Sequence, residues 1–392
     1  MHLTRLALTD FRCYHTADVT FEPGVSTFTG PNGAGKTNLI EAVGYVATFG
    51  SHRVSADAAM VRSGADRAIL RASVSAQTRD SLVEIELNPG RANRVRLNRV
   101  PLPRPREALG TLRCVLFAPE DLSIVKGDPD QRRRYLDDLL VASRPRYAAV
   151  RTDYERVVKQ LTALLKSARA AGRSLPAGIE VWDDQLIATG AALTAGRLRL
   201  IAALRPLMTS AYADVSADPR GASMTYRLGS GGSRSADPAR PSAGSSPPCG
   251  PEGSDGPPDI DALAEALRAS LDRVRRAELD RAVCLVGPHR DELELAIGDL
   301  PARGYASHGE SWSLALALRL ASFGLLRADG EDPVLMLDDV FAELDTGRRD
   351  RLAELASAAE QVLVTAAVAA DVPTRLAGSC YTVANGVIDH AQ

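Results

Sequence analysis

Residues 30–37 have the sequence Gly30-Pro31-Asn32-Gly33-Ala34-Gly35-Lys36-Thr37, which matches the phosphate-loop pattern G-x-x-x-x-G-K-[ST]. Residues 25–29 predict a short strand before it, and residues 38–49 predict a helix with one apolar face after it. The glycines would let backbone N–H groups close on phosphate oxygens, and a helix N-terminus adds positive potential. We therefore predict that this whole loop binds a nucleotide, with Lys36 on the β- and γ-phosphates and the Thr37 hydroxyl on Mg²⁺. The alternative is a glycine turn that binds nothing.

The composition is that of a chain with 392 residues, 45% of them hydrophobic, which is enough for two domains and a sizeable core. The formal net charge of −2 gives no general attraction to nucleic acid, so any DNA-binding surface has to be local. Only four of the 47 basic residues are lysines, and such an arginine bias beside abundant alanine is typical of a GC-rich genome.

The cysteines are scattered, with no CxxC pair and no metal-ligand spacing, which favours a reducing cytoplasm over a disulfide framework or a zinc site. They are Cys13, Cys114, Cys249, Cys284 and Cys380. No signal peptide opens the sequence, and we see no run of about 18 apolar residues that would span a membrane. We therefore expect a soluble cytoplasmic protein with no membrane partner.

Alternating apolar and polar residues at 3–8, 69–74 and 82–87 predict a small antiparallel sheet beside the phosphate loop. Asn98-Arg99 is a plausible turn between two further short strands. Residues 91–106 contain no acid and six arginines. These are Arg91, Arg94, Arg96, Arg99, Arg104 and Arg106. Two interpretations stay open for this tract: a solvated surface or a contact with a DNA backbone.

Changes of pattern along the rest of the chain suggest that two α/β parts flank a helical domain. A helical pattern begins near residue 131, and a strand predicted at 282–286 marks the return to α/β structure. We predict α/β parts at 1–130 and 278–392 and a mainly helical domain at 131–277 between them. Within the helical domain, residues 229–258 are rich in Gly, Ser and Pro and are expected to form a disordered insertion.

A second half of the nucleotide site is predicted near the C-terminus, where Val334-Leu335-Met336-Leu337-Asp338-Asp339 forms an apolar strand that ends in two carboxylates. This is the Walker B pattern. Asp338 would hold Mg²⁺, directly or through water, and Asp339 would orient or deprotonate the attacking water.

Ser307-His308-Gly309-Glu310 stands immediately before a long apolar helix at 312–326. A Ser-x-Gly-[Gln/Glu] stretch at a helix start presents a hydroxyl and free N–H groups to an anion. The alternative is an ordinary serine N-cap, with Glu310 closing a capping box. Glu343-Leu344-Asp345 follows the Walker B strand, in the place of a D-loop.

The order of these motifs resembles that of an ABC-type P-loop ATPase head. In such heads the Ser-x-Gly signature of one subunit covers the γ-phosphate held by the loop of another. The resemblance therefore implies an ATP-dependent homodimer that separates after hydrolysis. The implied catalytic residues are Lys36, Ser307, Asp338 and Asp339. The implied ligands are Ser307 and Gly309 for the nucleotide and Thr37 and Asp338 for the metal.

Further stretches resemble the RecF family of bacterial DNA replication and repair proteins along nearly the whole chain. The matching stretches are 8–14, Phe117-Ala118-Pro119-Glu120-Asp121-Leu122, Val125-Lys126-Gly127, Arg132-Arg133-Arg134-Tyr135-Leu136-Asp137, Gly287-Pro288-His289-Arg290-Asp291-Glu292-Leu293 and 337–345. This resemblance implies an α/β head, with a mixed sheet and a small antiparallel sheet, like the heads of Rad50 and SMC proteins. An inserted, mainly helical second domain would replace their long coiled coil.

The same resemblance implies a function. It implies weak, DNA-stimulated hydrolysis of ATP with Mg²⁺ and binding to gapped duplex or to junctions of single- and double-stranded DNA. Implied partners are RecO and RecR, with a role in loading the RecA recombinase and a link to the SOS response. We expect no sequence-specific reading of bases, because the sequence contains no recognised reading motif.

Some positions depart from the ABC pattern or have open roles. Asp339 stands where transporters have glutamate, and Thr365 where they have histidine, so we do not carry the role of γ-phosphate sensing over to Thr365. Arg12 occupies the place of a basic side chain near the phosphates in related heads, and Arg53 is a weaker candidate. The run Arg132–Arg134 is either DNA-facing or an ordinary basic helix start that needs a nearby anion. His289 and Arg290 are either a catalytic pair or a structural element of their loop.

Three alternative functions fit the motifs less well. An ABC transporter subunit would usually have the histidine that is missing here, and a purely structural SMC-like clamp would need hundreds of coiled-coil residues. A metabolic P-loop kinase would leave the signature and the D-loop unexplained. A DNA-binding switch, in which ATP changes the oligomeric state, accounts for all of these motifs.

Overall fold

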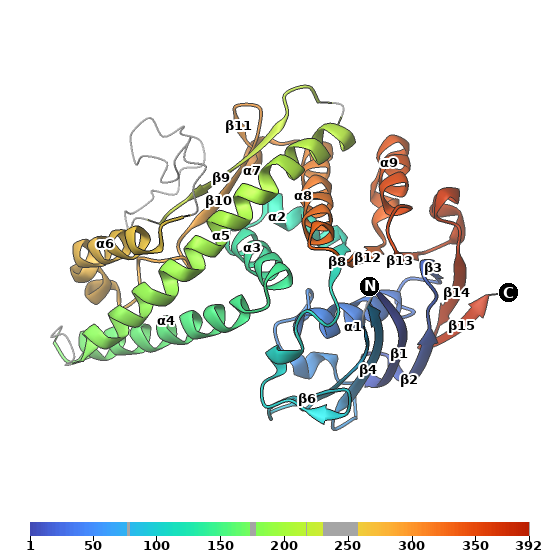
Figure 1. The fold of residues 1–392 in the computed structure, drawn as a ribbon, viewed down its shortest axis with the longest axis horizontal. Helices are drawn as coiled ribbons and strands as arrows, with labels where there is room; N and C mark the ends of the chain where they lie inside the picture. Colours follow the sequence, from blue (N-terminus) through green and yellow to red (C-terminus); the bar gives the residue numbers. More distant parts are fainter. Residues whose placement is uncertain (77–78, 173–177, 217, 230–257, 392) are drawn as a thin grey trace. The chain divides into compact units, whose positions relative to one another are not determined.

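The computed structural model describes every residue except 77–78, 173–177, 217, 230–257 and 392 (Figure 1). The predicted insertion at 229–258 thus lies almost entirely outside the described residues. The chain divides into two compact units. Unit 1 consists of Met1–Asp121, Ser210–Pro219 and Ser313–Gln392, and unit 2 of Leu122–Thr209 and Arg220–Trp312.

Unit 1 contains the predicted mixed sheet, with strand order β15-β14-β3-β13-β12-β8. Its strands are β3 (Gly24–Thr29), β8 (Cys114–Phe117), β12 (Val334–Asp338), β13 (Gln361–Ala366), β14 (Ser379–Ala384) and β15 (Val387–Ala391). All neighbouring strands are parallel except β15, which pairs antiparallel with β14. Strands β12 and β13 are buried throughout, as their mainly apolar sequences predict.

The predicted antiparallel sheet is also present in unit 1, with strand order β2-β1-β4-β5-β6-β7. Its strands are β1 (His2–Phe11), β2 (Tyr14–Thr20), β4 (Ala68–Ala76), β5 (Arg79–Leu87), β6 (Arg94–Leu97) and β7 (Val100–Pro101). Asn98 and Arg99 connect β6 to β7 with φ values of 51° and 70°, so the predicted turn has the left-handed residues of a tight hairpin.

One buried apolar cluster takes side chains from both sheets and from helix α1 (Lys36–Thr48). Leu6 and Leu70 come from the antiparallel sheet, Phe28 from the mixed sheet, and Leu39 and Val43 from α1. The helix that follows the phosphate loop is therefore fixed by the core. The shorter helices of this unit are α9 (Thr346–Ala356), η1 (Asp57–Met60), η2 (Pro105–Ala108), η3 (Pro119–Asp121), η4 (Val340–Glu343), η5 (Ala369–Asp371) and η6 (Thr374–Leu376).

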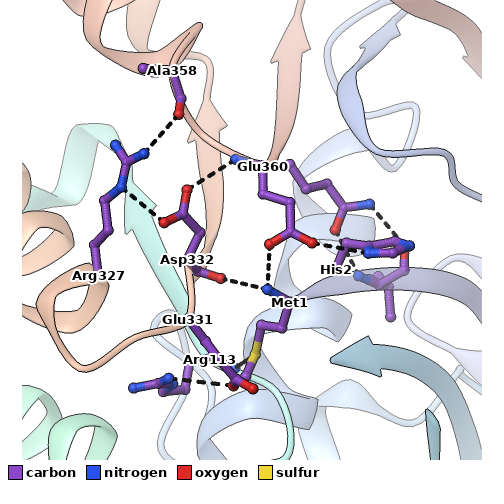
Figure 2. A network of polar contacts seen from close by, with 10 residues as sticks. Met1, His2, Arg113, Arg327, Glu331, Asp332, Ala358 and Glu360 are labelled. Atoms are coloured by element: carbon purple, nitrogen blue, oxygen red, sulfur yellow. Dashed lines mark hydrogen bonds and ion pairs between the residues drawn. The ribbon is translucent and has the colours of Figure 1, made fainter. Parts of the chain in front are cut away.

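The start of β1 is bound by polar contacts to residues just before β12 and at the entry to β13 (Figure 2). The Met1 amine lies 2.5 Å from Glu360 Oε2 and donates to the carbonyl of Asp332 at 3.3 Å. The Gln361 side chain accepts from Leu3 N at 2.7 Å and donates to Leu3 O at 2.8 Å, so it replaces a strand partner. These contacts join the antiparallel sheet to the mixed sheet.

Unit 2 is mainly helical, as predicted, and also contains a three-stranded sheet in the order β11-β10-β9. Its helices are α2 (Leu122–Lys126), α3 (Pro129–Ser143), α4 (Tyr147–Ala170), α6 (Ile260–Arg281) and α7 (Ala302–Tyr305), and its strands are β9 (Ala222–Arg227), β10 (Glu292–Ile297) and β11 (Leu300–Pro301). Helices α5 (Ile179–Val215) and α8 (His308–Ala328) contribute residues to both units.

The observed limits of unit 2 differ from the predicted domain limits of 131 and 277. Residues 282–286 do not form the predicted strand, and the chain enters β10 only at Glu292. Strand β10 pairs with β9 inside unit 2, so the stretch up to Trp312, with Ser307, belongs to this unit.

Helix α5 has the length and the hydropathy of a membrane span, a criterion that no segment was expected to meet. However, 61% of its apolar window is buried within the protein. Arg197 inside this helix is 2% exposed and binds both carboxylate oxygens of Asp137. Helix α5 is therefore packed as a core helix.

Candidate nucleotide-binding site

The phosphate loop connects β3 to α1, as the sequence predicted, and two of its glycines have no room for a side chain. A Cβ atom on Gly30 would lie 2.1 Å from the carbonyl oxygen of Val383. Gly35 has a φ of 121°, and a Cβ atom there would lie 2.7 Å from Cys13 Sγ. Tyr14 closes the same side by donating to Gly35 O at 2.9 Å. The loop is thus held against β14 and the β1–β2 connection.

Lys36 lies inside the curve of this loop. Its ammonium group donates to Gly30 O at 2.8 Å and to Pro31 O at 3.2 Å, and the residue is only 3% exposed. Backbone carbonyls therefore compensate the buried cation. The positive charge is already positioned where phosphates would enter.

Thr37 in the first turn of α1 meets Asp338 at the end of β12, as the motif pairing predicted. The Thr37 hydroxyl donates to Asp338 Oδ1 at 3.2 Å. Burial raises the pKa of Asp338 to about 6, and the adjacent Asp339 carboxylate adds to this effect. Hydrogen bonds from Thr365 and Thr37 oppose it. A cation placed between the two oxygens would reverse this shift, and oxygen ligands of this kind suit Mg²⁺.

Thr365, which the sequence identified only as the replacement for a histidine, lies at the centre of the acidic pair. It stands opposite Asp338 in the β12–β13 register. Its hydroxyl donates to Asp338 Oδ1 at 2.5 Å and accepts from the backbone N–H of Asp339 at 3.0 Å. Asp339 itself has a φ of 51° and is half-buried. The sequence signal for this hydrogen-bonding role was a threonine at the end of the strand that follows the Walker B strand.

The signature residues form the start of α8 and are described within unit 2. Ser307 Oγ accepts from Glu310 N at 3.3 Å, and Glu310 Oε2 accepts from Ser307 N at 2.7 Å. These reciprocal bonds are those of a capping box. An ion pair with Arg220 also holds the carboxylate of Glu310. The capping interpretation of this stretch is therefore confirmed, and Ser307 and Gly309 both remain accessible.

The D-loop residues form the start of α9. Asp345 caps this helix by accepting from Arg348 N at 3.0 Å, and Leu344 is buried. The Leu344 carbonyl accepts from Arg349 Nε at 2.8 Å. The D-loop is thus an ordered turn between the Walker B strand and the next helix.

Arg12 is placed beside α1, where it binds Glu41. Its Nε and Nη2 atoms donate to the two carboxylate oxygens of Glu41 at 2.8 and 2.7 Å, and Nη1 donates to Ala59 O at 2.8 Å. Glu41 is fully buried and also accepts from Ser51 Oγ at 2.5 Å. Arg53 lies 3.5 Å from the same carboxylate and donates to Asn38 at 2.9 Å. These contacts give Arg12 and Arg53 a structural role, and phosphate binding by either stays a prediction.

The arginine run that opens α3 has the nearby anion that a basic helix start needs. Arg132 is 4% exposed, and its Nε donates to Glu292 at 2.7 Å. Arg133 binds Asp130 and the Asp291 carbonyl. Arg132 is therefore a buried structural cation, which supports the interpretation of a basic helix start for this residue.

The Gly-Pro-His-Arg-Asp stretch lines the same polar core of unit 2. His289 Nδ1 lies 2.6 Å from Tyr154 OH, and Arg290 Nη2 donates to Cys284 O at 2.7 Å. Burial lowers the pKa of His289 to about 4. The structural interpretation of this pair accounts for these contacts.

A buried pair between α3 and α5 completes this polar core. Arg197 binds Asp137 with two hydrogen bonds of 2.7 and 2.8 Å, and it also donates to Tyr226 OH at 3.1 Å. Tyr226 in turn donates to Asp291 at 2.7 Å. One network thus joins Asp137 of the Arg132–Asp137 stretch to Asp291 of the Gly287–Leu293 stretch.

A parallel sheet that carries a phosphate loop and a Walker B strand, beside a six-stranded antiparallel sheet, is the architecture of an ABC-type ATPase head. The family described as RecF/RecN/SMC N-terminal domain matches residues 2–373. The chain is 56% identical to the DNA replication and repair protein RecF of Streptomyces avermitilis, over 99% of this chain and 100% of that protein. It belongs to the RecF family.

Other comparisons agree. RecF of Frankia alni is also 56% identical, over 99% of each chain. A solved structure of the recombination mediator protein RecF with ATPrS, in the RecFOR pathway, superposes with a TM-score of 0.86 at 25% identity and covers 100% of this chain and 98% of that one. An Smc head bound to the winged-helix domain of ScpA has a TM-score of 0.53 at 16% identity, over 100% and 97% of the two chains, and shares the fold alone.

Proposed function

We propose that this protein is an ATP-dependent DNA-binding switch of replication and recombinational repair. ATP with Mg²⁺ would bind the phosphate loop and bring two copies together, and the dimer would grip gapped duplex or a junction of single- and double-stranded DNA. Slow, DNA-stimulated hydrolysis would then release it. Relatives named as DNA replication and repair proteins, and a solved RecF complex with ATP, support this proposal.

The observation that carries the proposal is that Lys36 lies in the phosphate loop next to Thr37, which binds Asp338 at one edge of the mixed sheet. The Lys36 ammonium would exchange two carbonyl oxygens for phosphate oxygens, at little cost in reorganisation because it is already buried at the loop. Thr37 and Asp338 are the residues that would hold Mg²⁺, which neutralises charge on the phosphates when it is bound.

Asp339 is the residue that would orient or deprotonate the attacking water. Its backbone N–H is held by Thr365, so its position depends on the β12–β13 register. Its side chain is one methylene shorter than the glutamate of ABC transporters, and such a change in reach is consistent with slow turnover.

Ser307 would contact the γ-phosphate bound to a second copy. Its Oγ already accepts from Glu310 N, but a hydroxyl retains one hydrogen to donate to a phosphate oxygen. The capping box and the signature role are therefore compatible. The N–H of Gly309 would add a second donor at the same helix start.

The remaining parts of the proposal follow the family. The dimer would cooperate with RecO and RecR in loading the RecA recombinase onto single strands, with a link to the SOS response. All of these processes would take place in the cytoplasm. The RecFOR pathway of the solved relative supports this choice of partners.

The experiment is to measure solution mass for the wild type and for Ser307→Arg, with and without ATP and Mg²⁺ and with gapped duplex added. The expected result is a wild-type dimer that forms only with ATP and retains DNA, and a variant that stays monomeric. Ser357→Arg, at an exposed position after α9, adds the same charge elsewhere and should dimerise normally.

Circular dichroism would show that both variants are folded. A wild type that stays monomeric with ATP, or that binds DNA equally well without nucleotide, would contradict the switch. If the Ser307→Arg variant dimerises like the wild type, the signature at Ser307 has no role in ATP-dependent dimerisation.

A further inference from the structure

The arginine tract at 91–106 lies on the β6–β7 hairpin and its flanking turns, at the edge of the antiparallel sheet of unit 1. We call its six arginines the hairpin arginines. All are exposed except Arg106, which is half-buried. They form a local cationic surface on a chain whose formal net charge is −2.

Strand periodicity explains why two of these side chains face solvent. Val95 is buried under the sheet, so Arg94 and Arg96 on either side of it lie on the outer face. In the β5–β6 register Arg94 stands opposite Glu86 and Arg96 opposite Glu84.

These two glutamates are already bound on their other side. Glu86 accepts from Arg67, and Glu84 accepts from Arg71, each at 3.2 Å. The carboxylates are thus shared with arginines before and within β4, and the outer face keeps an excess of positive charge.

The other arginines of unit 1 differ from the hairpin arginines in their binding partners. Apart from Arg79, each described arginine of this unit outside the tract binds a carboxylate or a carbonyl. Within the described residues, no ion pair or hydrogen bond is recorded for the side chains of the hairpin arginines. Clustered cations repel one another, so a surface of this kind fits a polyanion.

The sheet edge beside these arginines is unsuited to a peptide partner that adds a strand. Strand β7 has only two residues, Val100–Pro101, and proline has no N–H to offer a neighbouring strand. Arginine, in contrast, binds phosphate through two parallel N–H donors. The partner that fits is therefore a phosphate backbone.

We infer that the hairpin arginines form a contact surface for the sugar-phosphate backbone of DNA, without reading base sequence. This inference rests on the proposed function and adds the surface on which DNA lies. Contacts to phosphates fix the register of a protein on DNA but carry no sequence information.

The test is the triple variant Arg94→Gln, Arg96→Gln, Arg104→Gln, compared with a control triple, Arg5→Gln, Arg351→Gln, Arg375→Gln. The control removes the same charge from arginines of unit 1 that are bound to carboxylates. Fluorescence anisotropy of a labelled duplex would be measured with ATP and Mg²⁺ over a series of salt concentrations. DNA-free ATPase rate and melting temperature would establish that both variants keep the fold and the nucleotide site.

The hairpin triple should weaken binding about tenfold or more at low salt, and the slope of log K against log salt should fall by about 0.9 for each lost phosphate contact. The control triple should bind within about threefold of the wild type. If both triple variants weaken DNA binding equally, the effect comes from the general loss of charge, and the proposed DNA-contact surface is wrong.

Two further outcomes separate this inference from the proposed function. If the wild type binds DNA with ATP and the hairpin triple binds equally well, the surface is wrong while the switch stands, and an acidic protein becomes the partner to test. If the wild type binds no DNA in any nucleotide state, the proposed function fails and the surface fails with it.

Discussion

The Thr37 hydroxyl lies 3.2 Å from Asp338 Oδ1, although 301 residues separate the two in the chain. Strand β13 pairs in parallel with both β3 and β12, so the C-terminal ends of the three strands share one edge. The magnesium ligands proposed for this chain therefore depend on sheet register, and the predictions below test that dependence.

Asp338→Asn should lower the ATPase rate by about a hundredfold or more, because the amide is a weaker ligand for Mg²⁺ and carries no charge. The measurement is steady-state phosphate release. Asp350→Asn removes a carboxylate from the exposed face of α9 and should leave the rate unchanged. A rate for Asp338→Asn within a few-fold of the wild type would show that this carboxylate is no ligand.

Binding of ATP with Mg²⁺ should weaken as the pH falls below about 6, since burial raises the pKa of Asp338 to about 6 and the metal requires the ionised form. The expected loss approaches tenfold for each pH unit. Calorimetric titrations between about pH 5 and pH 8 would measure it, with binding measured in parallel without metal. Affinity that is flat across this range would mean that Asp338 ionises as an ordinary carboxyl group.

The same shift has a consequence for stability in the absence of metal. A carboxyl group whose pKa is higher in the folded state stabilises the fold fully below its unfolded pKa of 3.8, and this contribution is lost as pH rises through about 6. Unfolding by urea should therefore show a decrease in stability over this window. The Asp338→Asn variant should lack it, because it has no proton to lose at this position.

Thr365→Val should lower the ATPase rate about tenfold or more, because it removes the hydrogen bond to Asp338 and the side-chain acceptor for Asp339 N–H, leaving only the Thr365 carbonyl at 3.3 Å. It should also move the lower pH limit of Mg²⁺-dependent binding upward, since the Thr365 hydroxyl lowers the pKa of Asp338. Thr365→Ser keeps the hydroxyl and should stay close to the wild type. Equal rates for the valine and serine variants would assign Thr365 to packing alone.

Arg12→Ala should destabilise unit 1 by about 3–5 kcal/mol, because the fully buried Glu41 would lose its two hydrogen bonds to Arg12 and keep only Ser51 and the more distant Arg53. Burial acts to raise the pKa of Glu41, but hydrogen bonds from Arg12 and Ser51 outweigh it, and the pKa is lowered. Urea unfolding measures the loss. Arg12→Ala paired with Glu41→Gln should recover part of it.

Nucleotide affinity distinguishes the two roles of Arg12. If the arginine serves only Glu41, the double variant should bind ATP like the wild type. If the arginine also contacts phosphate, as the sequence resemblance implies, ATP affinity should stay low in both variants.

Arg197→Met should destabilise the protein by about 3–5 kcal/mol, because it leaves Asp137 buried without a cation. The double variant Arg197→Met, Asp137→Leu should recover most of this loss, because two apolar side chains can replace a buried ion pair. Thermal unfolding of the four proteins gives the coupling energy. A coupling near zero would show that Arg197 is held by Tyr226 and the backbone instead.

Much of the nucleotide site could be predicted from sequence because its chemistry is local. The glycines and Lys36 stand within one loop, and steric rules for glycine fix their spacing. The alternation of apolar and polar residues predicted the antiparallel strands, and the apolar sequence that ends in two carboxylates at 334–339 predicted the Walker B strand. The sequence at 307–310 is compatible with both predicted roles, because a capping box and an anion site can use the same helix start.

Other features depended on partners that lie far apart in the chain. Thr365 supports Asp338 only because β12 and β13 pair in one register. Arg132 is a structural cation only because β10 places Glu292 beside α3. The strand predicted at 282–286 is absent, and the chain joins its sheet at β10 instead.

The sequence by itself therefore determined the family and predicted the candidate nucleotide site and the two kinds of sheet, because each is written in short motifs and local residue patterns. Only the tertiary structure decided which arginines are neutralised. Arg12 and Arg132 are buried against glutamates, while Arg94 and Arg96 face solvent beside glutamates that other arginines hold. Ion pairing depends on distances of a few ångströms between side chains, and packing across sheets and helices sets those distances.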